Sequence, residues 1–132
     1  MEITTSTVQG RAPVTVLQLK GDLDASTIDA FTAVANQAVE GGAHDILVDM
    51  AGTPFMSSAG IRALHNLYTR LHPSGTPAEQ DAIYQAINAG TYSAPHLKLL
   101  KPTKKVEEVI RLAGLDMYLT IFTSLEEAVA AF

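Results

Sequence analysis

A strand, a turn and a helix in direct succession, within residues 45–67, place the strongest constraint on the fold of this chain. Residues 46–50 read Ile-Leu-Val-Asp-Met, a short apolar run typical of a buried strand. The sequence Ala-Gly-Thr-Pro at 51–54 predicts a turn, because Gly and Pro are unfavourable inside strands and common in turns. Phe55 and Met56 are then expected to return the chain to the core.

Ser57 and Ser58 stand where the helix is expected to begin. One of the two hydroxyls is predicted to cap the helix by accepting a hydrogen bond from an unpaired backbone N–H. The same position would suit a phosphate, because free N–H groups and the positive end of the helix dipole would face it. Two serines at a helix start leave both interpretations open. The apolar residues of the helix recur at the spacing of an amphipathic face, at Ile61, Leu64, Leu67, Tyr68 and Leu71.

The rest of the chain alternates predicted strands with predicted helices. Strands are expected at residues 2–8, 14–20, 96–100 and 118–122, the first two as a hairpin. Ser26 or Thr27 is expected to cap the first helix, and Asp29 to complete a variant of the capping box. Thr103 and Ser124 are expected to cap the last two helices. The helix after Thr103 is predicted to turn four apolar residues inward, namely Val106, Val109, Ile110 and Leu112.

This order of elements predicts an α/β fold, with a mostly parallel sheet of four to five strands covered by helices. Residues 73–95 stand apart from the alternation. Pro73, Gly75 and Pro77 are expected to end the preceding helix, and residues 78–88 then favour a short additional helix with apolar positions of its own. We therefore interpret this segment as a helical insertion.

Length and charge narrow the function classes. A chain of 132 residues fits one domain, residues 1–132, with one core. Its net charge of −5 gives no support for binding nucleic acid through a basic surface. The one concentration of positive charge is interpreted as solvated surface and consists of Lys98, Lys101, Lys104, Lys105 and Arg111.

The sequence also argues against export and membrane insertion. Its first residues contain no basic stretch followed by an apolar one, so no signal peptide is predicted. No apolar run approaches the roughly 20 residues that a membrane helix needs. The absence of cysteine excludes disulfides and thiolate metal sites. The protein is therefore expected to be soluble and cytoplasmic.

No residue pattern supports an enzyme, a cofactor or a metal site. A nucleophilic serine needs a nearby base, and His65 lies about two helical turns beyond Ser58. His65 and His72 are too far apart for a metal-binding pair at i and i+4. There is no nucleophile-elbow motif, no P-loop and no dinucleotide-binding glycine pattern. We expect a binding protein that uses neither a metal nor a cofactor.

Four segments, in a fixed order, carry the pattern of a known family. They are Leu-Lys-Gly-Asp-Leu-Asp at 19–24, the strand at 46–50, Phe-Met-Ser-Ser-Ala-Gly-Ile at 55–61, and the segment 106–115, which ends in Leu-Ala-Gly-Leu. Together they resemble the STAS domain, and within it the anti-sigma factor antagonists (anti-anti-sigma factors). The resemblance covers nearly the whole chain, except that residues 73–95 are longer than the family's connection at this place.

The resemblance implies a phosphorylation switch. In the family, the unphosphorylated antagonist binds an anti-sigma factor that is also a serine kinase. The kinase phosphorylates a serine at the start of the second main helix, the complex then separates, and a serine phosphatase reverses the reaction. Ser58 matches the acceptor, with Ser57 as the alternative. Ser57 replaces the family's usual Asp and Ala59 lacks its second hydroxyl, two differences that bear on recognition by the kinase.

Partner binding is predicted for Asp22, Asp24, Ser57, Ala59 and Gly60. The two aspartates follow the second strand and are expected to lie near the serines, although ordinary loop chemistry explains them almost equally well. Close packing is the corresponding alternative for the glycine. An alternative function is that of a STAS-type subunit of a transport or multiprotein signalling assembly, which acts by constitutive protein–protein contacts. The serines would then serve as helix caps alone.

Overall fold

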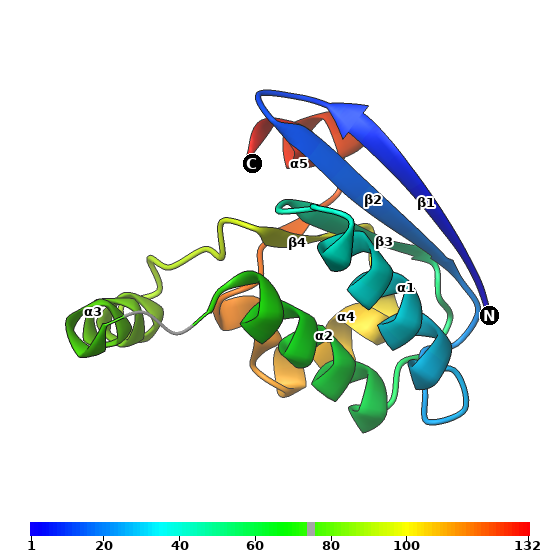
Figure 1. Ribbon diagram of the computed structural model, residues 1–132. Helices are drawn as coiled ribbons and strands as arrows, with labels where there is room; N and C mark the ends of the chain where they lie inside the picture. Colours follow the sequence, from blue (N-terminus) through cyan, green and yellow to red (C-terminus); the bar gives the residue numbers. More distant parts are fainter. Residues whose placement is uncertain (74–75) are drawn as a thin grey trace.

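The computed structural model describes residues 1–73 and 76–132 and shows a five-stranded sheet with helices on both faces (Figure 1). The strands lie in the order β1-β2-β3-β4-β5. The first two form an antiparallel hairpin, and each later strand runs parallel to its neighbour. The predicted α/β fold with a mostly parallel sheet is therefore confirmed. The strands are β1 (Glu2–Gln9), β2 (Pro13–Lys20), β3 (Ile46–Gly52), β4 (Leu97–Leu100) and β5 (Ile121–Phe122).

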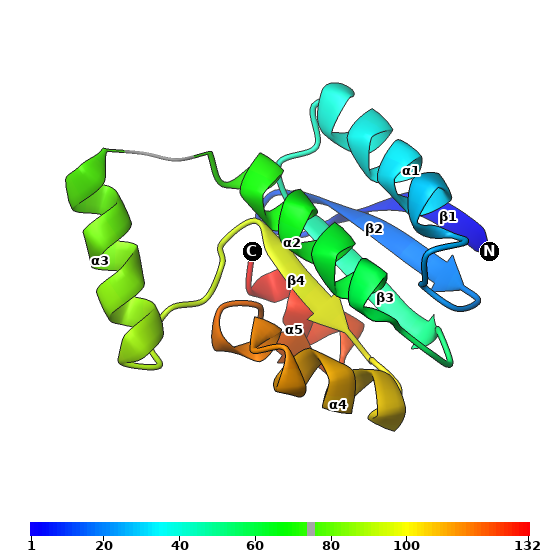
Figure 2. The same cartoon turned by 90° about the horizontal axis from the view of Figure 1, so that it is seen from below.

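Three helices cover one face of the sheet and one helix covers the other. The helices are α1 (Ile28–Glu40), α2 (Ser58–Leu71), α3 (Pro77–Asn88), α4 (Lys104–Leu112) and α5 (Leu125–Ala130), with a turn of 3₁₀ helix at Leu115–Met117. Helices α1, α2 and α4 lie side by side on one face, and α5 lies behind the sheet (Figures 1 and 2). This layering is the one that a parallel sheet requires, because both of its faces must be shielded from water.

The main core lies between the sheet and helices α1, α2 and α4. Alternate side chains of the central strands point into this core, since successive residues of a strand face opposite sides. Phe31 of α1 and Leu64 of α2 are fully buried against them. The strand residues of the main core are Leu17, Leu19, Ile46, Val48, Met50, Leu97 and Leu99. The intervening residues build a smaller core against α5, from Val14, Val16, Leu47 and Leu100.

Three local predictions are wrong. Helix α1 begins after Thr27, whose side chain makes no capping bond, so the capping box of Ser26 and Asp29 does not form. Instead the Thr27 hydroxyl donates to the carbonyl of Asp22 at 2.8 Å. The last strand spans two residues only, because the N–H groups of Tyr118 and Leu119 donate back to the carbonyl of Leu115 in the preceding 3₁₀ turn and not to a neighbouring strand. Leu112 is 90 % exposed rather than inward, because the buried stripe of α4 runs through Val106 and Ile110 and leaves Leu112 on the outer side.

Lys98 also departs from the prediction, because it is buried instead of solvated, at 3 % exposure. Its Nζ donates hydrogen bonds to the carbonyl of Ala94 at 3.0 Å and to Oγ of Ser93 at 3.3 Å, and lies 5.3 Å from the centre of the Phe132 ring. Burial lowers the pKa of Lys98. Both faces of β4 are covered, so even the one charged residue of this strand is enclosed.

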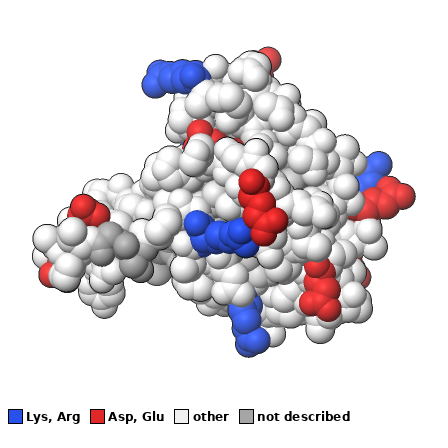
Figure 3. Space-filling model, viewed as in Figure 1, with Lys and Arg blue, Asp and Glu red and all other residues white. Residues whose placement is uncertain are grey.

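The predicted insertion helix is present as α3, and it stands away from the sheet and the other helices (Figures 1 and 3). None of its residues is buried. Its cap is Thr76, whose hydroxyl accepts a 3.2 Å hydrogen bond from the N–H of Glu79. Helix α2 ends at Leu71, before Pro73, as expected. Gly75, another predicted helix breaker, lies outside the described residues.

Candidate functional site

The two serines take different positions at the start of α2. Ser57 is the N-cap residue, with an extended backbone (φ −96°, ψ 178°), and its Oγ accepts a hydrogen bond of 3.2 Å from the N–H of Ala59. Ser58 is the first helical residue, and it is exposed. The prediction that one hydroxyl caps the helix is confirmed for Ser57, and the capping role does not occupy Ser58.

Residues 22–24 run alongside the segment that leads into α2. Leu23 forms an isolated parallel bridge with Met56. Its N–H donates to the carbonyl of Phe55, and its own carbonyl accepts from the N–H of Ser57, both at 3.0 Å. The side chains of the bridging pair are buried, at 0 % and 1 % exposure. The loop after β2 is therefore attached directly to the helix start, and it carries the two flanking aspartates with it.

The two aspartates differ in what their carboxylates do. Oδ1 of Asp24 accepts hydrogen bonds from the N–H of Ser26 at 2.9 Å and from its hydroxyl at 2.6 Å. These bonds, that of the Ser26 side chain first, lower the pKa of Asp24. Asp24 thus organises the turn before α1, as the loop-chemistry interpretation expects. The side chain of Asp22 is exposed, and within the described part of the chain no such bond engages its carboxylate.

Gly60 is buried at the point where α2 meets the 22–24 loop. A Cβ atom here would lie 2.8 Å from the carbonyl oxygen of Leu23 and 2.7 Å from Cγ of Met56. Close packing therefore accounts for this glycine, and its predicted role in partner binding stays a prediction. Ala59 is half-buried, and its N–H is already taken by the cap.

Phe55 is a surface residue that the sequence interpretation placed in the core. Its side chain is 38 % exposed, and Nζ of Lys105, at the start of α4, lies 5.5 Å from the centre of its ring. A hydrogen bond of 3.3 Å from the Thr103 hydroxyl to the carbonyl of Thr53 holds the two segments together. A signal for this exposure was present in the sequence: adjacent residues of an extended segment point in opposite directions, and Met56 fills the core.

The start of α2 has no carboxylate of its own, although the 22–24 loop brings two aspartates to its neighbourhood. The first turn of α2 contains no acidic residue, whereas each of the other four helices has at least one there. The positive end of the helix dipole is therefore not offset by a carboxylate of the same helix. Arg62 lies four residues beyond Ser58, which places both on one side of the helix. The helix N-terminus and Arg62 would favour an anion at Ser58, whereas the aspartates of the 22–24 loop would oppose it.

The described residues do not place a base beside Ser58. Nδ1 of His65, the histidine that follows it on α2, is hydrogen-bonded at 2.8 Å to the hydroxyl of Tyr118. Within residues 1–73 and 76–132, no group of three or more His, Asp or Glu side chains is arranged to hold a metal ion. No helix of this part of the chain is long and apolar enough to cross a membrane.

A model of the STAS domain matches residues 5–77. The match covers more than half of the chain, and the chain belongs to the STAS domain family. It includes residues 22–24 and both serines and ends at the first residue of α3, so the insertion helix lies almost wholly beyond it. A comparison with curated proteins finds no match.

Solved structures of anti-sigma factor antagonists have the same fold. One from Mycobacterium paratuberculosis is 19 % identical over 98 % of this chain and 93 % of its own, with a TM-score of 0.70. A STAS domain protein of this class from Planctomyces limnophilus is 17 % identical over 96 % of each chain, with a TM-score of 0.67. The phosphorylated form of the Bacillus cell fate determinant SpoIIAA is 20 % identical over 97 % and 96 %, with a TM-score of 0.61.

Proposed function

We propose that the chain acts as a single binding module in the cytoplasm, as an anti-sigma factor antagonist that a phosphate on Ser58 switches off. The observation that carries the proposal is that the adjacent hydroxyls of Ser57 and Ser58 have different roles. That of Ser57 caps α2, while Ser58 is exposed at the first helical position. Phosphate on Ser58 would leave the cap in place, whereas phosphate on Ser57 would remove it.

The surface around Ser58 supports recognition by a protein partner. Phe55 offers an exposed aromatic ring, Lys105 a positive charge and Asp22 a negative one. A phosphate adds about −1.5 to −2 charges and three acceptor oxygens at neutral pH. In an interface with such a mixed surface, the added charge must be desolvated or must face groups arranged for a neutral hydroxyl. Phosphorylation is therefore expected to weaken the complex.

The structural relatives support a switch that acts on the surface and not on the fold. The chain has TM-scores of 0.60 and 0.61 with the unphosphorylated and phosphorylated forms of SpoIIAA. The two forms of that protein thus share the fold found here. The partner of the present chain would be an anti-sigma factor with serine kinase activity, and a serine phosphatase would restore the binding form.

The phosphorylation step is tested by intact mass after incubation with ATP and the candidate kinase encoded beside the gene. We expect a gain of one phosphate that disappears in Ser58→Ala and remains in Ser57→Ala. Loss in Ser57→Ala alone would move the acceptor to the alternative position. No phosphate on the wild-type chain, with a kinase shown to be active on another substrate, would contradict the proposal.

The binding step is tested by the affinity of the kinase partner for Ser58→Asp. Asn66→Asp is the matched control, because it adds the same charge at another exposed position of α2. Ser58→Asp is expected to weaken binding by about tenfold or more, as a desolvated like charge or unpaired carboxylate does, with the control close to wild type. Equal affinity of the two variants would contradict a switch at Ser58.

A second candidate function is a STAS-type subunit held in a larger assembly by constitutive contacts. Helix α3 favours it, because Tyr84 is 68 % exposed and Ile83 36 % exposed on an element with no buried residue. If Tyr84→Ala abolishes a complex from the native cells while Ser58→Ala and Ser58→Asp leave it intact, this alternative replaces the first. A complex that responds to Ser58 alone excludes it.

A further inference from the structure

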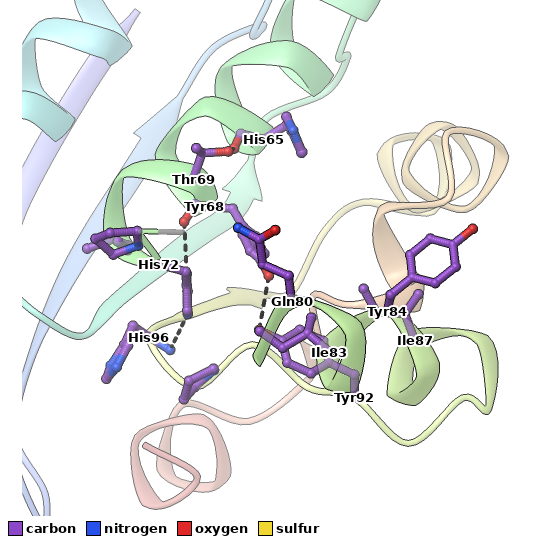
Figure 4. A pocket seen from close by; sticks show the side chains of 13 residues that line it. His65, Tyr68, Thr69, His72, Gln80, Ile83, Tyr84, Ile87, Tyr92 and His96 are labelled. Atoms are coloured by element: carbon purple, nitrogen blue, oxygen red, sulfur yellow. Dashed lines mark hydrogen bonds between the residues drawn. The ribbon is translucent and has the colours of Figure 1, made fainter. Parts of the chain in front are cut away.

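A cavity of about 570 Å³ lies between the C-terminal half of α2 and the insertion helix α3, at the opposite end of α2 from Ser58 (Figure 4). The segment between α3 and β4 completes its wall through Tyr92 and His96. The cavity is open to solvent. Its size is within the range of small-molecule sites, about 300–1,000 Å³.

The wall on the α2 side is built on a connected set of aromatic rings. The Tyr68 ring lies at its centre, 4.5 Å from that of His72, and is supported from outside the lining by Tyr118, whose ring is 4.8 Å away. The His72 ring lies 5.2 Å from that of His96. Each ring is therefore held by its neighbours, and the wall is formed before any ligand arrives. Such a surface suits the face or edge of another aromatic ring.

The opposite wall belongs to α3, where Gln80 and Tyr84 accompany two isoleucines, and no residue of it enters a buried core. Ile83 and Ile87 of α3 line the cavity, although no residue of α3 is buried (Figure 4). A 12-residue helix without tertiary packing is only marginally stable in water. A flat molecule between the two walls would bury apolar surface of both, and would attach α3 to the body of the protein.

The lining contains hydrogen-bonding groups but no Lys, Arg, Asp or Glu among its described residues. The hydroxyls of Tyr68 and Tyr92 are 3.0 Å apart, and since one proton serves this bond, the other hydroxyl can donate to a ligand. Burial raises the pKa of Tyr68, which therefore keeps its proton. Burial also lowers the pKa of His72, which favours the neutral ring.

We propose that this cavity is a binding site for a neutral, planar aromatic small molecule with a hydrogen-bond acceptor. The ring lies between the Tyr68 wall and the side chains of Ile83 and Ile87, and the acceptor receives the free proton of the tyrosine pair. A charged ligand is disfavoured, because no Lys, Arg, Asp or Glu among the described residues lines the site to replace its lost hydration. The site is independent of the proposed phosphorylation of Ser58.

The ligand class is tested with three probes titrated into the ¹⁵N-labelled full chain and followed by amide chemical shifts. Quinoline is neutral and planar with a ring-nitrogen acceptor, cyclohexanol is neutral but not flat, and benzoate is flat but charged. We expect saturable shifts with quinoline at residues that line the cavity, and none with the other two. Absence of saturable quinoline shifts, or equal responses to cyclohexanol or benzoate, overturns the proposal.

The location is tested with a pair of charge variants on α3. Ile83→Glu places a carboxylate on the cavity wall, whereas Gln85→Glu places the same charge at an exposed position outside the lining. The first is expected to weaken quinoline binding by about tenfold or more, and the second to leave it within about twofold. Quinoline should also slow amide hydrogen exchange in α3 of the wild type and the control. Equal weakening in both variants, or unchanged exchange in α3, overturns the proposed position.

Discussion

The backbone N–H of His96 donates a hydrogen bond of 3.1 Å to Nε2 of His72, and this bond joins the two ends of the insertion. Nδ1 of the same His72 ring lies 2.8 Å from the carbonyl oxygen of Tyr68. A carbonyl can only accept, so Nδ1 carries the proton and Nε2 is the acceptor. His96 is held in turn, through its own Nδ1, by Asp45 at 2.8 Å. The two ends of the insertion are thus held together by the hydrogen bond between His72 and His96, which we call the closed base of the insertion.

Protonation of His72 should break the hydrogen bond between His72 and His96. A proton on Nε2 would face the N–H of His96, and the bond would be lost. Burial lowers the pKa of His72 below its ordinary value of 6.5. The contribution of the neutral ring to the free energy of unfolding is therefore complete above pH 6.5 and is lost as the pH falls through the lowered pKa. Urea unfolding between about pH 5 and about pH 7.5 should show stability rising with pH.

The matched variants for this prediction are His72→Gln and His44→Gln. The amide oxygen of Gln can accept from the His96 N–H but does not titrate, so the rise with pH should be smaller in His72→Gln. His44 is exposed, and its replacement should leave the rise unchanged. An identical pH dependence of the wild type and His72→Gln would show that another group is responsible.

The two serines should differ in their effect on stability. Ser57→Ala removes the acceptor of the Ala59 N–H and is expected to lower the free energy of unfolding by about 1 kcal/mol. Ser58→Ala removes an exposed hydroxyl and is expected to change it by less than about 0.5 kcal/mol. Urea denaturation of the two variants measures the difference. The reverse order would assign the cap to Ser58 and free Ser57 for phosphate.

Replacement of Gly60 by alanine should destabilise the protein, although the same change inside a helix normally stabilises by up to about 1 kcal/mol. The new Cβ would lie 2.8 Å from the carbonyl oxygen of Leu23, a backbone atom held by the bond to Ser57. We expect a loss of about 1–3 kcal/mol in urea denaturation, as for other overpacked sites. A gain in stability would mean that α2 can move away from the 22–24 loop.

Replacement of Asp24 should affect the stability of the fold, whereas replacement of Asp22 should affect partner binding. Asp24→Ala removes the acceptor of both Ser26 bonds and should lower the stability of the fold. Because these bonds lower the pKa of Asp24, this contribution is present above pH 3.8 and is lost as the pH falls through the lowered value. Asp22→Ala should leave the thermal midpoint unchanged and weaken binding of the kinase partner. Unchanged partner affinity in Asp22→Ala would remove this residue from the interface.

The order of strands and helices was predictable, because hydrophobic period and cap residues are local signals. Thr103 and Ser124 cap α4 and α5 as expected, each by accepting an N–H three residues on. The position of the helix start near the 22–24 loop also followed from the fold, since the ends of neighbouring parallel strands meet at one edge. The bridge between Leu23 and Met56 joins the loop to the segment before the helix, in agreement with that expectation.

Other features depended on which elements cover a residue, and a local pattern does not contain that information. Lys98 is enclosed because α5 and Phe132 close the second face of the sheet. Leu112 has helical spacing typical of a core residue, but the core lies on the side of α4 that carries Val106 and Ile110. The cavity beside α3 could not be predicted for the same reason. It is formed by α2 and α3, whose relative position depends on the hydrogen bond between His72 and His96.

Helix α2 carries the proposed phosphate acceptor at its first residue and ends at Leu71, directly before the histidine that closes the insertion. Its 14 residues separate the two ends by about 20 Å. Changes this far apart, without shared partners, usually combine additively. The double variant Ser58→Asp/Ile83→Glu should therefore bind the partner as weakly as Ser58→Asp alone, and quinoline as weakly as Ile83→Glu alone. Substitutions in the cavity at one end of α2 would then leave the proposed switch at the other end unchanged. Related proteins with this fold could therefore keep the switch and bind different small molecules.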